Sequence, residues 1–427
     1  MTLEVAIIGA GIAGLTAARH LASTGADVTI YEEQSEVGGR VRSRDIDGYT
    51  LDRGFQVLFT EYPTVKQELD LNSLDLRYFT PGAVLARSGK RSVLSDPLRD
   101  PMAILESATN REVTFFDKLR VMRLRWKLRN KDHETIFKGD DTTIENYLAK
   151  EGFSKKFINN FIAPFYGGIT LDRSLQTSKR VFEYTFRTLG QGKIAVPANG
   201  MGEISKQLKK NAKTAGVNIE TKTRITGIDS TEENVTVHIE DDTISADIAV
   251  ISTDAKTAKC LSGVEAVPTA GKGVITQYYA VNSSAAPEGK RLLLNIEGSS
   301  PSHIVPISSV APEYSSGSKE LIAAVYLGEK VKTELNNEEL ADQTKQALAN
   351  WYPSRNFSDM ETIATDRITF AQFQQPPNIH ESLPDVDTPD GNCYFAGEFT
   401  EWSSIEGAMR SGVKAASVIQ DNHLKEK

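Results

Sequence analysis

Apolar and polar positions at the start of the chain follow a strand period first and a helical period next. Residues 3–8 form a short apolar run rich in β-branched side chains, which predicts a buried strand. Apolar residues then recur at helical spacing over positions 15–22, and Gly25 ends that helix. A second strand is predicted over residues 28–31, directly before Glu32. This order of elements is typical of an α/β protein with a parallel sheet.

The rest of the chain contains a helical stretch and two groups of short strands. Residues 102–165 are mostly helical in pattern, and alternating segments between residues 217 and 251 predict strands, the last of which returns to the parallel sheet. Four more alternating segments lie at 273–281, 291–296, 303–307 and 321–327, followed by an amphipathic helix over 337–351.

The turn between the first strand and the first helix is rich in glycine. It has the pattern G-x-G-x-x-G, in which Gly9 permits a tight turn, Gly11 lets the backbone approach a pyrophosphate and Gly14 allows close packing of helix on strand. The N-terminus of the helix offers free N–H groups and a partial positive charge to phosphates. We therefore predict a dinucleotide site with contacts from Gly9, Gly11, Ile12, Ala13 and Gly14.

An acidic residue follows this turn at the distance that a ribose contact requires. Glu32 stands eighteen residues after Gly14, where it would accept hydrogen bonds from the adenosine ribose diol and repel a 2′-phosphate. A glycine-rich turn in an ordinary α/β unit does not need an acid there. We include Glu32 and its neighbour Glu33 among the expected cofactor contacts.

The segment after this acid distinguishes FAD from NAD. Residues 36–40 have the sequence Glu-Val-Gly-Gly-Arg, in which the paired glycines let a second loop close over the pyrophosphate and Arg40 can pair with it. In this arrangement the sequence resembles the superfamily of flavin amine oxidases, phytoene desaturases and protoporphyrinogen oxidases. The resemblance implies FAD as cofactor, with Gly39 and Arg40 at the pyrophosphate.

The same resemblance implies a two-domain α/β fold of the amine-oxidase type. A Rossmann-like FAD-binding domain would comprise residues 1–80, 190–265 and 385–427, and a discontinuous α+β substrate-binding domain would comprise residues 81–189 and 266–384. The substrate domain would roof the flavin.

Further cofactor contacts follow from the resemblance alone. The loop after a D-x-G element would lie along the flavin ring and contribute Gly54, Phe55, Gln56 and Val57. The backbone of Ile225 would hold the adenine, and the Gly397-Glu398 segment would hold the ribityl chain and pyrophosphate. Reduced flavin is negative near N1 and O2, so the N-terminus of the last helix would stabilise it through Ile405 or Glu406, with Ala408 nearby.

Two of the residues that amine oxidases of this superfamily use beside the flavin are absent at the matching positions, while Trp402 would supply the first member of their aromatic pair. Thr276 stands where those enzymes have a lysine, and Ser404 stands where the second member of an aromatic pair is expected. Because the flavin carries the hydride chemistry, we assign no catalytic residue. The candidates for the pocket wall, each with an alternative structural role, are Gln277, Tyr278, Tyr166 and Trp402.

Composition excludes several other classes of protein. The chain has 427 residues, of which 39% are hydrophobic and 25% charged, as expected for two soluble globular domains. Its net charge of −8 argues against a nucleic-acid partner. Two cysteines form no disulfide framework, and six histidines lack metal-ligand spacing, so we expect no metal. No signal peptide or apolar run of about 18 residues occurs, so we expect a cytoplasmic protein.

A basic segment over residues 111–131 stands out in this acidic chain. Phe115, Leu119, Met122 and Trp126 form one apolar stripe, and lysine or arginine occupies many of the other positions. The pattern favours a surface helix whose stripe packs on the core while the cationic side chains face water. The alternative is peripheral contact with an anionic membrane surface.

These observations lead to one functional hypothesis and three alternatives. We predict an FAD-dependent oxidoreductase that passes a hydride from a hydrophobic small molecule to flavin N5, acting like a desaturase or isomerase on a polyene or isoprenoid. Its electron acceptor would be O₂ or a quinone. The alternatives are a flavin amine oxidase, a protoporphyrinogen-type oxidase and a non-catalytic FAD-binding protein.

Overall fold

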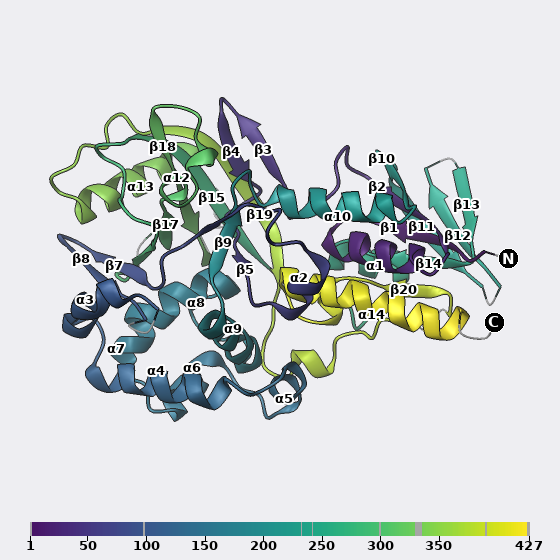
Figure 1. The fold of residues 1–427 in the computed structure, drawn as a ribbon, viewed down its shortest axis with the longest axis horizontal. Helices are drawn as coiled ribbons and strands as arrows, with labels where there is room; N and C mark the ends of the chain where they lie inside the picture. The colour runs from purple at the N-terminus through teal and green to yellow at the C-terminus, as the bar shows by residue number, and fades with distance from the viewer. Residues whose placement is uncertain are drawn as a thin grey trace.

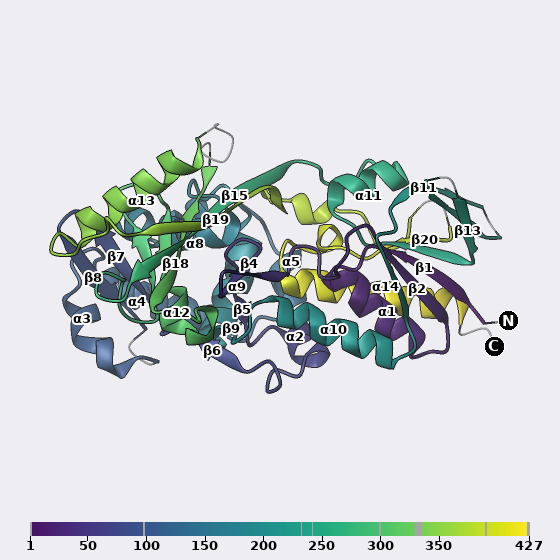
Figure 2. The same ribbon diagram turned by 90° about the horizontal axis from the view of Figure 1, so that it is seen from above.

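The protein is built from two regions that lie end to end along its long axis, with both termini at the same end (Figures 1 and 2). The computed structural model describes residues 2–96, 99–231, 233–240, 242–298, 300–328, 335–388 and 391–424. The region that carries the termini is organised on a parallel sheet, and the other region on a larger mixed sheet.

The five-stranded sheet of the first region is parallel throughout. Its order is β10 (Asn218–Thr221), β2 (Asp27–Glu32), β1 (Glu4–Ile8), β14 (Ile248–Ile251) and β20 (Cys393–Phe395). The central strand alternates its faces: Val5 and Ile7 pack on the helical side, while Ala6 and Ile8 pack on the opposite side. Burial of both faces explains why this strand is a continuous apolar run.

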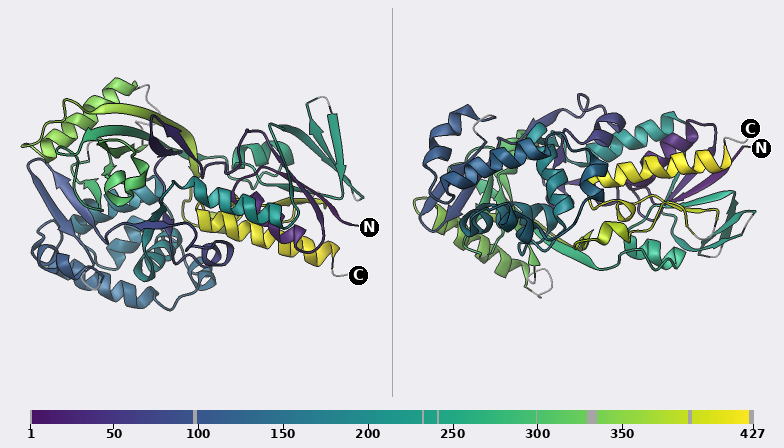
Figure 3. Two further views of the ribbon diagram at one scale, coloured as in Figure 1. Left: turned by 45° about the horizontal axis from the view of Figure 1, so that its top comes forward. Right: turned by 90° about the horizontal axis from the view of Figure 1, so that it is seen from below.

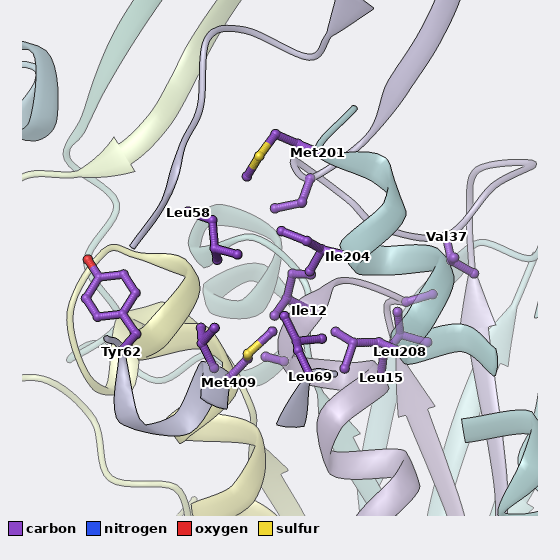
Figure 4. Packing of buried hydrophobic residues seen from close by; sticks show 14 of the residues in the cluster. Ile12, Leu15, Val37, Leu58, Tyr62, Leu69, Met201, Ile204, Leu208 and Met409 are labelled. Carbon is purple, nitrogen blue, oxygen red and sulfur yellow. The ribbon is translucent and has the colours of Figure 1, made fainter. Parts of the chain in front are cut away.

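Three helices cover one face of this sheet, and a small antiparallel meander covers the other. Helix α1 (Ile12–Ala22) lies between α10 (Gly202–Thr214) and α14 (Ile405–His423), as Figure 1 shows. Figure 4 shows the apolar contacts between them, with Ile12 and Leu15 of α1 facing Ile204 and Leu208 of α10, and Met409 of α14 close by. The opposite face is covered by β11 (Ile225–Ser230), β12 (Val235–Ile239), β13 (Asp242–Ala246) and α11 (Ala255–Ser262).

The second region contains a seven-stranded sheet. Its order is β19 (Glu361–Phe373), β15 (Gly271–Asn282), β18 (Lys319–Tyr326), β17 (His303–Val305), β16 (Leu292–Asn295), β7 (Ala83–Arg87) and β8 (Lys90–Leu94). All neighbours are antiparallel except β16 and β7. Helix α13 (Asn337–Trp351) packs on one face, where Leu340, Leu348 and Trp351 are buried.

A layer of helices forms the other side of the second region (Figure 3). It comprises α3 (Ile104–Thr109), α4 (Phe115–Leu128), α5 (His133–Lys138), α6 (Ile144–Lys150), α7 (Lys155–Phe157), the π-helical turn η2 (Ile158–Ile162), α8 (Ala163–Thr170) and α9 (Lys179–Gln191). Helix α4 begins with a capping box in which Thr114 and Asp117 satisfy each other's backbone N–H groups.

Short elements connect the two regions. They are β3 (Ser43–Ile46), β4 (Tyr49–Asp52), β5 (Leu58–Phe59), β6 (Leu76–Tyr78), β9 (Ile194–Pro197), α2 (Pro63–Glu68) and α12 (Ile307–Val310). Asp52 is a central contact here, because its carboxylate accepts hydrogen bonds from Ser43 Oγ at 2.6 Å, the Met201 N–H at 2.8 Å and the Tyr314 hydroxyl at 2.9 Å. Complete burial raises the pKa of Asp52 from 3.8 to about 6.

The mixed α/β architecture with a parallel sheet confirms the predicted fold class. The residue boundaries predicted for the two domains stay a prediction. Two features were not anticipated. The long strand β19 was not recognised in the sequence, and the orientation predicted for α4 is wrong, since Phe115, Leu119, Met122 and Trp126 face outward rather than into the core. Among the described helices, none is both long enough and apolar enough to cross a lipid bilayer.

Candidate functional site

A cavity of ≈ 1020 Å³ lies where the two regions meet. Its walls come from the β1–α1 turn, the end of β2, the loops at 38–42 and 53–57 and the start of α14. The second region contributes residues of α8, β16, β17, β18 and β19. The cavity therefore extends from the predicted dinucleotide segment to the helical layer and the large sheet.

The first glycines have separate structural roles. Gly9 adopts φ +105°, a conformation that favours glycine, and a methyl group on Gly14 would lie 2.2 Å from the Gly9 carbonyl oxygen. A methyl group on Gly11 would meet no atom within 4 Å, because this residue faces the cavity. Gly14 thus permits the packing of helix on strand, while Gly11 leaves open the space where a pyrophosphate would approach the N-terminus of α1.

Glu32 is buried at the edge of the cavity and holds two backbone segments. Its carboxylate accepts hydrogen bonds from the Ala10 N–H at 2.8 Å and the Gln34 N–H at 2.9 Å. These bonds fix the acid directly beside the glycine turn, with Glu33 also on the cavity wall. The position suits recognition of a ribose diol.

The two ends of the chain meet at a side-chain ion pair in the cavity wall. Arg40 donates a hydrogen bond to Glu398 Oε1 at 2.5 Å and another to the Ala371 carbonyl at 2.8 Å. The second oxygen of Glu398 accepts a hydrogen bond from Ser403 Oγ at 2.7 Å. A guanidinium fixed in this way is placed to pair with a diphosphate.

The loop at 53–57 lines the cavity and is held in place by several hydrogen bonds. Gly54 adopts φ +74° and donates its N–H to Asp366 Oδ2 at 2.9 Å. The Phe55 N–H donates to Thr276 Oγ1 at 3.2 Å, and the Gln56 side-chain Nε2 donates to the Arg40 carbonyl at 2.7 Å. This loop is therefore held by both regions, with Phe55, Gln56 and Val57 on the cavity wall.

The start of α14 closes the other side of the site. Ser404 caps the helix by accepting the Gly407 N–H at 2.8 Å, and both Ile405 and Ala408 line the cavity. The Glu406 side chain points away and accepts the Thr64 and Val65 N–H groups at the start of α2. Burial raises the pKa of Glu406. The open N-terminus of α14 could stabilise negative charge in the cavity.

These features fit an FAD molecule. Two helix N-termini border one cavity, a side-chain-free surface lies at Gly11, and an acid and an arginine stand where a ribose and a pyrophosphate need them. Ile225 also lines the cavity, on the side of α11.

Comparison with known proteins identifies the family. A family model described as flavin containing amine oxidoreductase matches residues 12–420. The chain belongs to the flavin-containing amine oxidoreductase family. It is accordingly an FAD-dependent oxidoreductase, which confirms the predicted superfamily, cofactor and enzyme class.

The individual proteins that this chain resembles share little sequence identity with it. It is 22% identical over 475 residues to a 15-cis-phytoene desaturase of Narcissus pseudonarcissus, an alignment that covers 99% of the chain and 80% of the relative. Protoporphyrinogen oxidase 2 of Arabidopsis thaliana is 26% identical over 167 residues, covering 39% of the chain and 32% of that protein. Cyclohexylamine oxidase from Brevibacterium oxydans shares the fold with a TM-score of 0.73 at 17% identity, over 99% of each chain.

Most of the predicted cofactor residues meet around the cavity. Gly14 and Glu406 do not line it: the first packs inside the β1–α1 unit and the second caps α2. As contacts of bound FAD they all stay predictions. Those on the wall are Gly9, Gly11, Ile12, Ala13, Glu32, Glu33, Gly39, Arg40, Gly54, Phe55, Gln56, Val57, Ile225, Gly397, Glu398, Ile405 and Ala408.

Three of the four predicted pocket residues are not on the cavity wall. Trp402 lines it, but Gln277 is buried away from it and donates to the Asn337 carbonyl at 2.9 Å. Tyr278 donates its hydroxyl to the Asp52 carbonyl at 2.7 Å, and Tyr166 packs on Phe182 with ring centres 4.5 Å apart. Strand alternation and helix packing turn these side chains into the core.

His303 is a cavity residue that was not singled out in the sequence. It forms the centre of a cross-strand row with Leu294 on β16 and Val325 on β18, and all three line the cavity. Its ring centre lies 6.0 Å from that of Phe55. Burial, with a smaller effect from Arg173, lowers the pKa of His303 to about 3. A histidine inside an otherwise apolar strand, Ser-His-Ile-Val, was the available signal.

Proposed function

We propose that this FAD-dependent oxidoreductase acts on a hydrophobic small molecule, a polyene or isoprenoid, from which it removes a hydride as a desaturase does; an isomerase-like reaction would return that hydride to the product. The observation that carries the proposal is the apolar end of the cavity, which we define by Phe55, Phe79, Phe165, Ile169, Leu292, Leu294, His303 and Val325. A pocket walled by these side chains favours an apolar occupant.

The charges on the cavity wall support this choice over an amine. The acidic residues among the described lining residues are Glu32, Glu33, Asp254 and Glu398, all in the segments beside the predicted dinucleotide site. A protonated amine at the apolar end would have no carboxylate to compensate its charge. The wall contains one lysine among its described residues, Lys256, whose ammonium lies 5.3 Å from the Phe370 ring on the same side as α11.

The position at which amine oxidases have a lysine has a different role here. Thr276 is fully buried, and its hydroxyl oxygen accepts the Phe55 N–H. Thr276 belongs to the same cross-strand row as Val325 and His303. The polar group that reaches the cavity from this row is therefore the imidazole of His303, two strands away.

FAD supplies the hydride acceptor when it is bound. The chain supplies the surroundings: aromatic and aliphatic walls exclude water, and the loop at 53–57 is fixed by Asp366 and Thr276. His303 stays neutral over the physiological range because its pKa is about 3. A neutral imidazole can orient a substrate by a hydrogen bond without placing a charge in the apolar end, and it is a weak proton acceptor.

The proposal is tested by anaerobic reduction of the holoprotein. A C₄₀ or C₃₀ polyene supplied in detergent should bleach the flavin absorbance, whereas putrescine and cyclohexylamine should not. Reoxidation of the reduced protein by a quinone and by O₂ then identifies the acceptor. Bleaching by an amine, or by a protoporphyrinogen alone, would contradict the proposal, and a flavin that no substrate reduces would favour a non-catalytic binding protein.

A pair of variants tests whether reduction of the flavin by a polyene depends on the apolar end of the cavity. Val325→Asp places a carboxylate in the cavity and should abolish polyene reduction while the protein still binds FAD. His238→Gln alters an exposed histidine of the meander and should leave both properties unchanged. FAD content, measured by absorbance after heat release, separates a lost substrate site from a lost cofactor.

A further inference from the structure

The outer face of helix α4 exposes large apolar side chains to solvent. Phe115, Leu119, Met122 and Trp126 are 67%, 46%, 56% and 80% exposed, and they recur at positions i, i+4, i+7 and i+11 along one face. The opposite face of the helix carries Leu124 and Leu128, which are buried. The helix thus has two apolar faces, and the narrower one packs on the core.

The exposed apolar side chains of the protein are concentrated in this one place. Eight large hydrophobic residues are exposed in the described part of the chain, and seven of them fall between positions 102 and 126. We call these seven the outer apolar patch: Met102, Leu105, Phe115, Phe116, Leu119, Met122 and Trp126. A concentration of exposed large apolar side chains of this kind marks a binding surface rather than chance exposure.

Helices α3 and α4 are held together, so that the patch has a fixed support. Lys118 of α4 donates hydrogen bonds to the Ser107 carbonyl at 2.6 Å and the Ala108 carbonyl at 3.0 Å in the last turn of α3. At the start of α4, Ser154 donates to Asp117 at 2.6 Å, which ties α4 to the N-terminus of α7.

Cationic side chains surround the patch. Residues 101–131 contain eight lysines and arginines against three acidic residues, in a chain whose net charge is −8. Arg123 and Lys127 share Glu151 at 2.7 and 2.5 Å, while Arg111 and Arg129 are exposed at the two ends of α4. Long cationic side chains beside an apolar row can reach anionic headgroups while the row enters the acyl boundary.

The patch is the outer side of the wall that encloses the cavity. Leu124 and Leu128 of α4 belong to one buried cluster with Phe157, against which Phe165 and Ile169 pack. Phe165 and Ile169 in turn line the apolar end of the cavity. A row of rings from Phe153 through Phe157 and Phe161 to Phe165, with centres 4.9 to 5.6 Å apart, spans this wall.

We propose that α3 and α4 dock this protein on an anionic lipid bilayer, with the outer apolar patch inserted at the headgroup boundary and the flanking arginines and lysines at the headgroups. The charge excess of the segment and its aromatic side chains, including Trp126, favour a lipid surface over an acidic protein. The inference goes beyond the proposed reaction and does not depend on the identity of the substrate.

The test uses the FAD-loaded full chain and vesicles of two compositions. Vesicles of phosphatidylcholine with about 30% phosphatidylglycerol should carry the protein to the top of a density gradient at low salt. Pure phosphatidylcholine vesicles should carry much less, and added salt should release the protein. Trp126 is the exposed tryptophan, whereas Trp351 and Trp402 are buried, so the anionic vesicles should shift the fluorescence to the blue.

Matched variants separate the apolar and charged contributions. Phe116→Ser with Trp126→Ser, and separately Arg111→Gln with Arg129→Gln, should each reduce vesicle binding about tenfold. Tyr78→Ser removes the one exposed large apolar side chain among the described residues outside the patch, and Lys210→Gln with Lys213→Gln removes two cations of α10. Both control variants should bind vesicles as the unchanged protein does, and all variants should retain FAD.

Three results would overturn the proposal. These are failure of the unchanged protein to float with anionic vesicles at low salt, flotation of the Phe116→Ser/Trp126→Ser protein at the wild-type level, and loss of binding in the α10 control. If light scattering shows a dimer that the Phe116→Ser/Trp126→Ser change converts to a monomer, without vesicle binding in either form, the patch is an interface between two copies.

Discussion

Arg40 and Glu398 are 358 positions apart in the sequence, and their side chains meet at 2.5 Å in the wall of the cofactor cavity. Arg40 follows the paired glycines after the first βαβ unit, and Glu398 follows strand β20. The contact joins the first and last segments of the FAD-binding side of the protein.

Glu398→Gln should weaken FAD binding about ten- to hundredfold, since the charged partner that positions the Arg40 guanidinium is lost. Fluorescence titration of the apoprotein with FAD measures the effect. Glu401→Gln is the matched control, because it removes a carboxylate that pairs with Arg410 at 2.9 Å outside the cavity wall. Equal affinity of the Glu398 variant and the unchanged protein would refute the positioning role.

Two glycine substitutions in the same turn should have opposite consequences. Gly11→Ala adds a methyl group to open space at a φ of −73°, so the apoprotein should fold normally and lose FAD affinity. Gly14→Ala drives a methyl group to 2.2 Å from the Gly9 carbonyl, so it should lower thermal stability or prevent folding. Thermal unfolding of both apoproteins, followed by FAD titration, distinguishes the two. A Gly11→Ala protein that retains full affinity would exclude a close pyrophosphate approach at this residue.

Glu32→Ala should reduce FAD affinity by about tenfold or more, because the Ala10 and Gln34 N–H groups lose their acceptor and the ribose loses its partner. The measurement is the fraction of flavin retained through gel filtration. Glu33→Ala, at the neighbouring wall position, should have a smaller effect, because the Glu33 carboxylate accepts a hydrogen bond from the exposed Gln34 side-chain amide, at 3.1 Å, rather than from the glycine turn. Full flavin retention in the Glu32 variant would count against the ribose role.

Asp52 should make stability fall as the pH rises through weakly acidic values. Its folded-state pKa is raised from 3.8 to about 6, so the folded protein holds this proton more tightly than the unfolded chain does. The contribution of this proton to the free energy of unfolding is fully present below about pH 4 and is lost by about pH 6. The total change is about 3 kcal/mol. Asp52→Asn removes this titration while it can still accept the Ser43 and Met201 hydrogen bonds.

The expected measurement is the difference in unfolding free energy between Asp52→Asn and the unchanged protein. That difference should shift by about 3 kcal/mol in favour of the variant between pH 4 and pH 7. A difference that does not depend on pH would show that Asp52 titrates normally. Comparison of two proteins at each pH cancels the effects of the other carboxyl groups.

Sequence reasoning was strongest where function depends on local backbone geometry. The glycine turn after β1 and the start of α14 are set by neighbouring residues and are found where predicted. It was weaker for α4, because a helix with apolar residues on two faces does not reveal which face meets the core. Tertiary packing of Leu124 and Leu128 decides that question.

The prediction that Gln277 and Tyr278 line the pocket was wrong for a related reason. Every residue from Val274 to Val281 of β15 is buried, so the sequence shows no alternation that separates the cavity face from the opposite face. Tyr278 and Gln277 therefore could not be assigned to a face. His303 was missed because its role arises from two neighbours, Leu294 and Val325, that lie on other strands.

The parallel sheet has a consequence for the synthesis of this protein. Strand β1 pairs with β14, which leaves the ribosome more than two hundred residues later, and α14 packs on α1 where Gly412 faces the Ala13 carbonyl. A nascent chain that has exposed only its glycine turn consequently lacks half of the flavin cradle. Cofactor loading must therefore wait until α14 has been synthesised, because a product that ends before α14 lacks the residues of this helix that line the cavity.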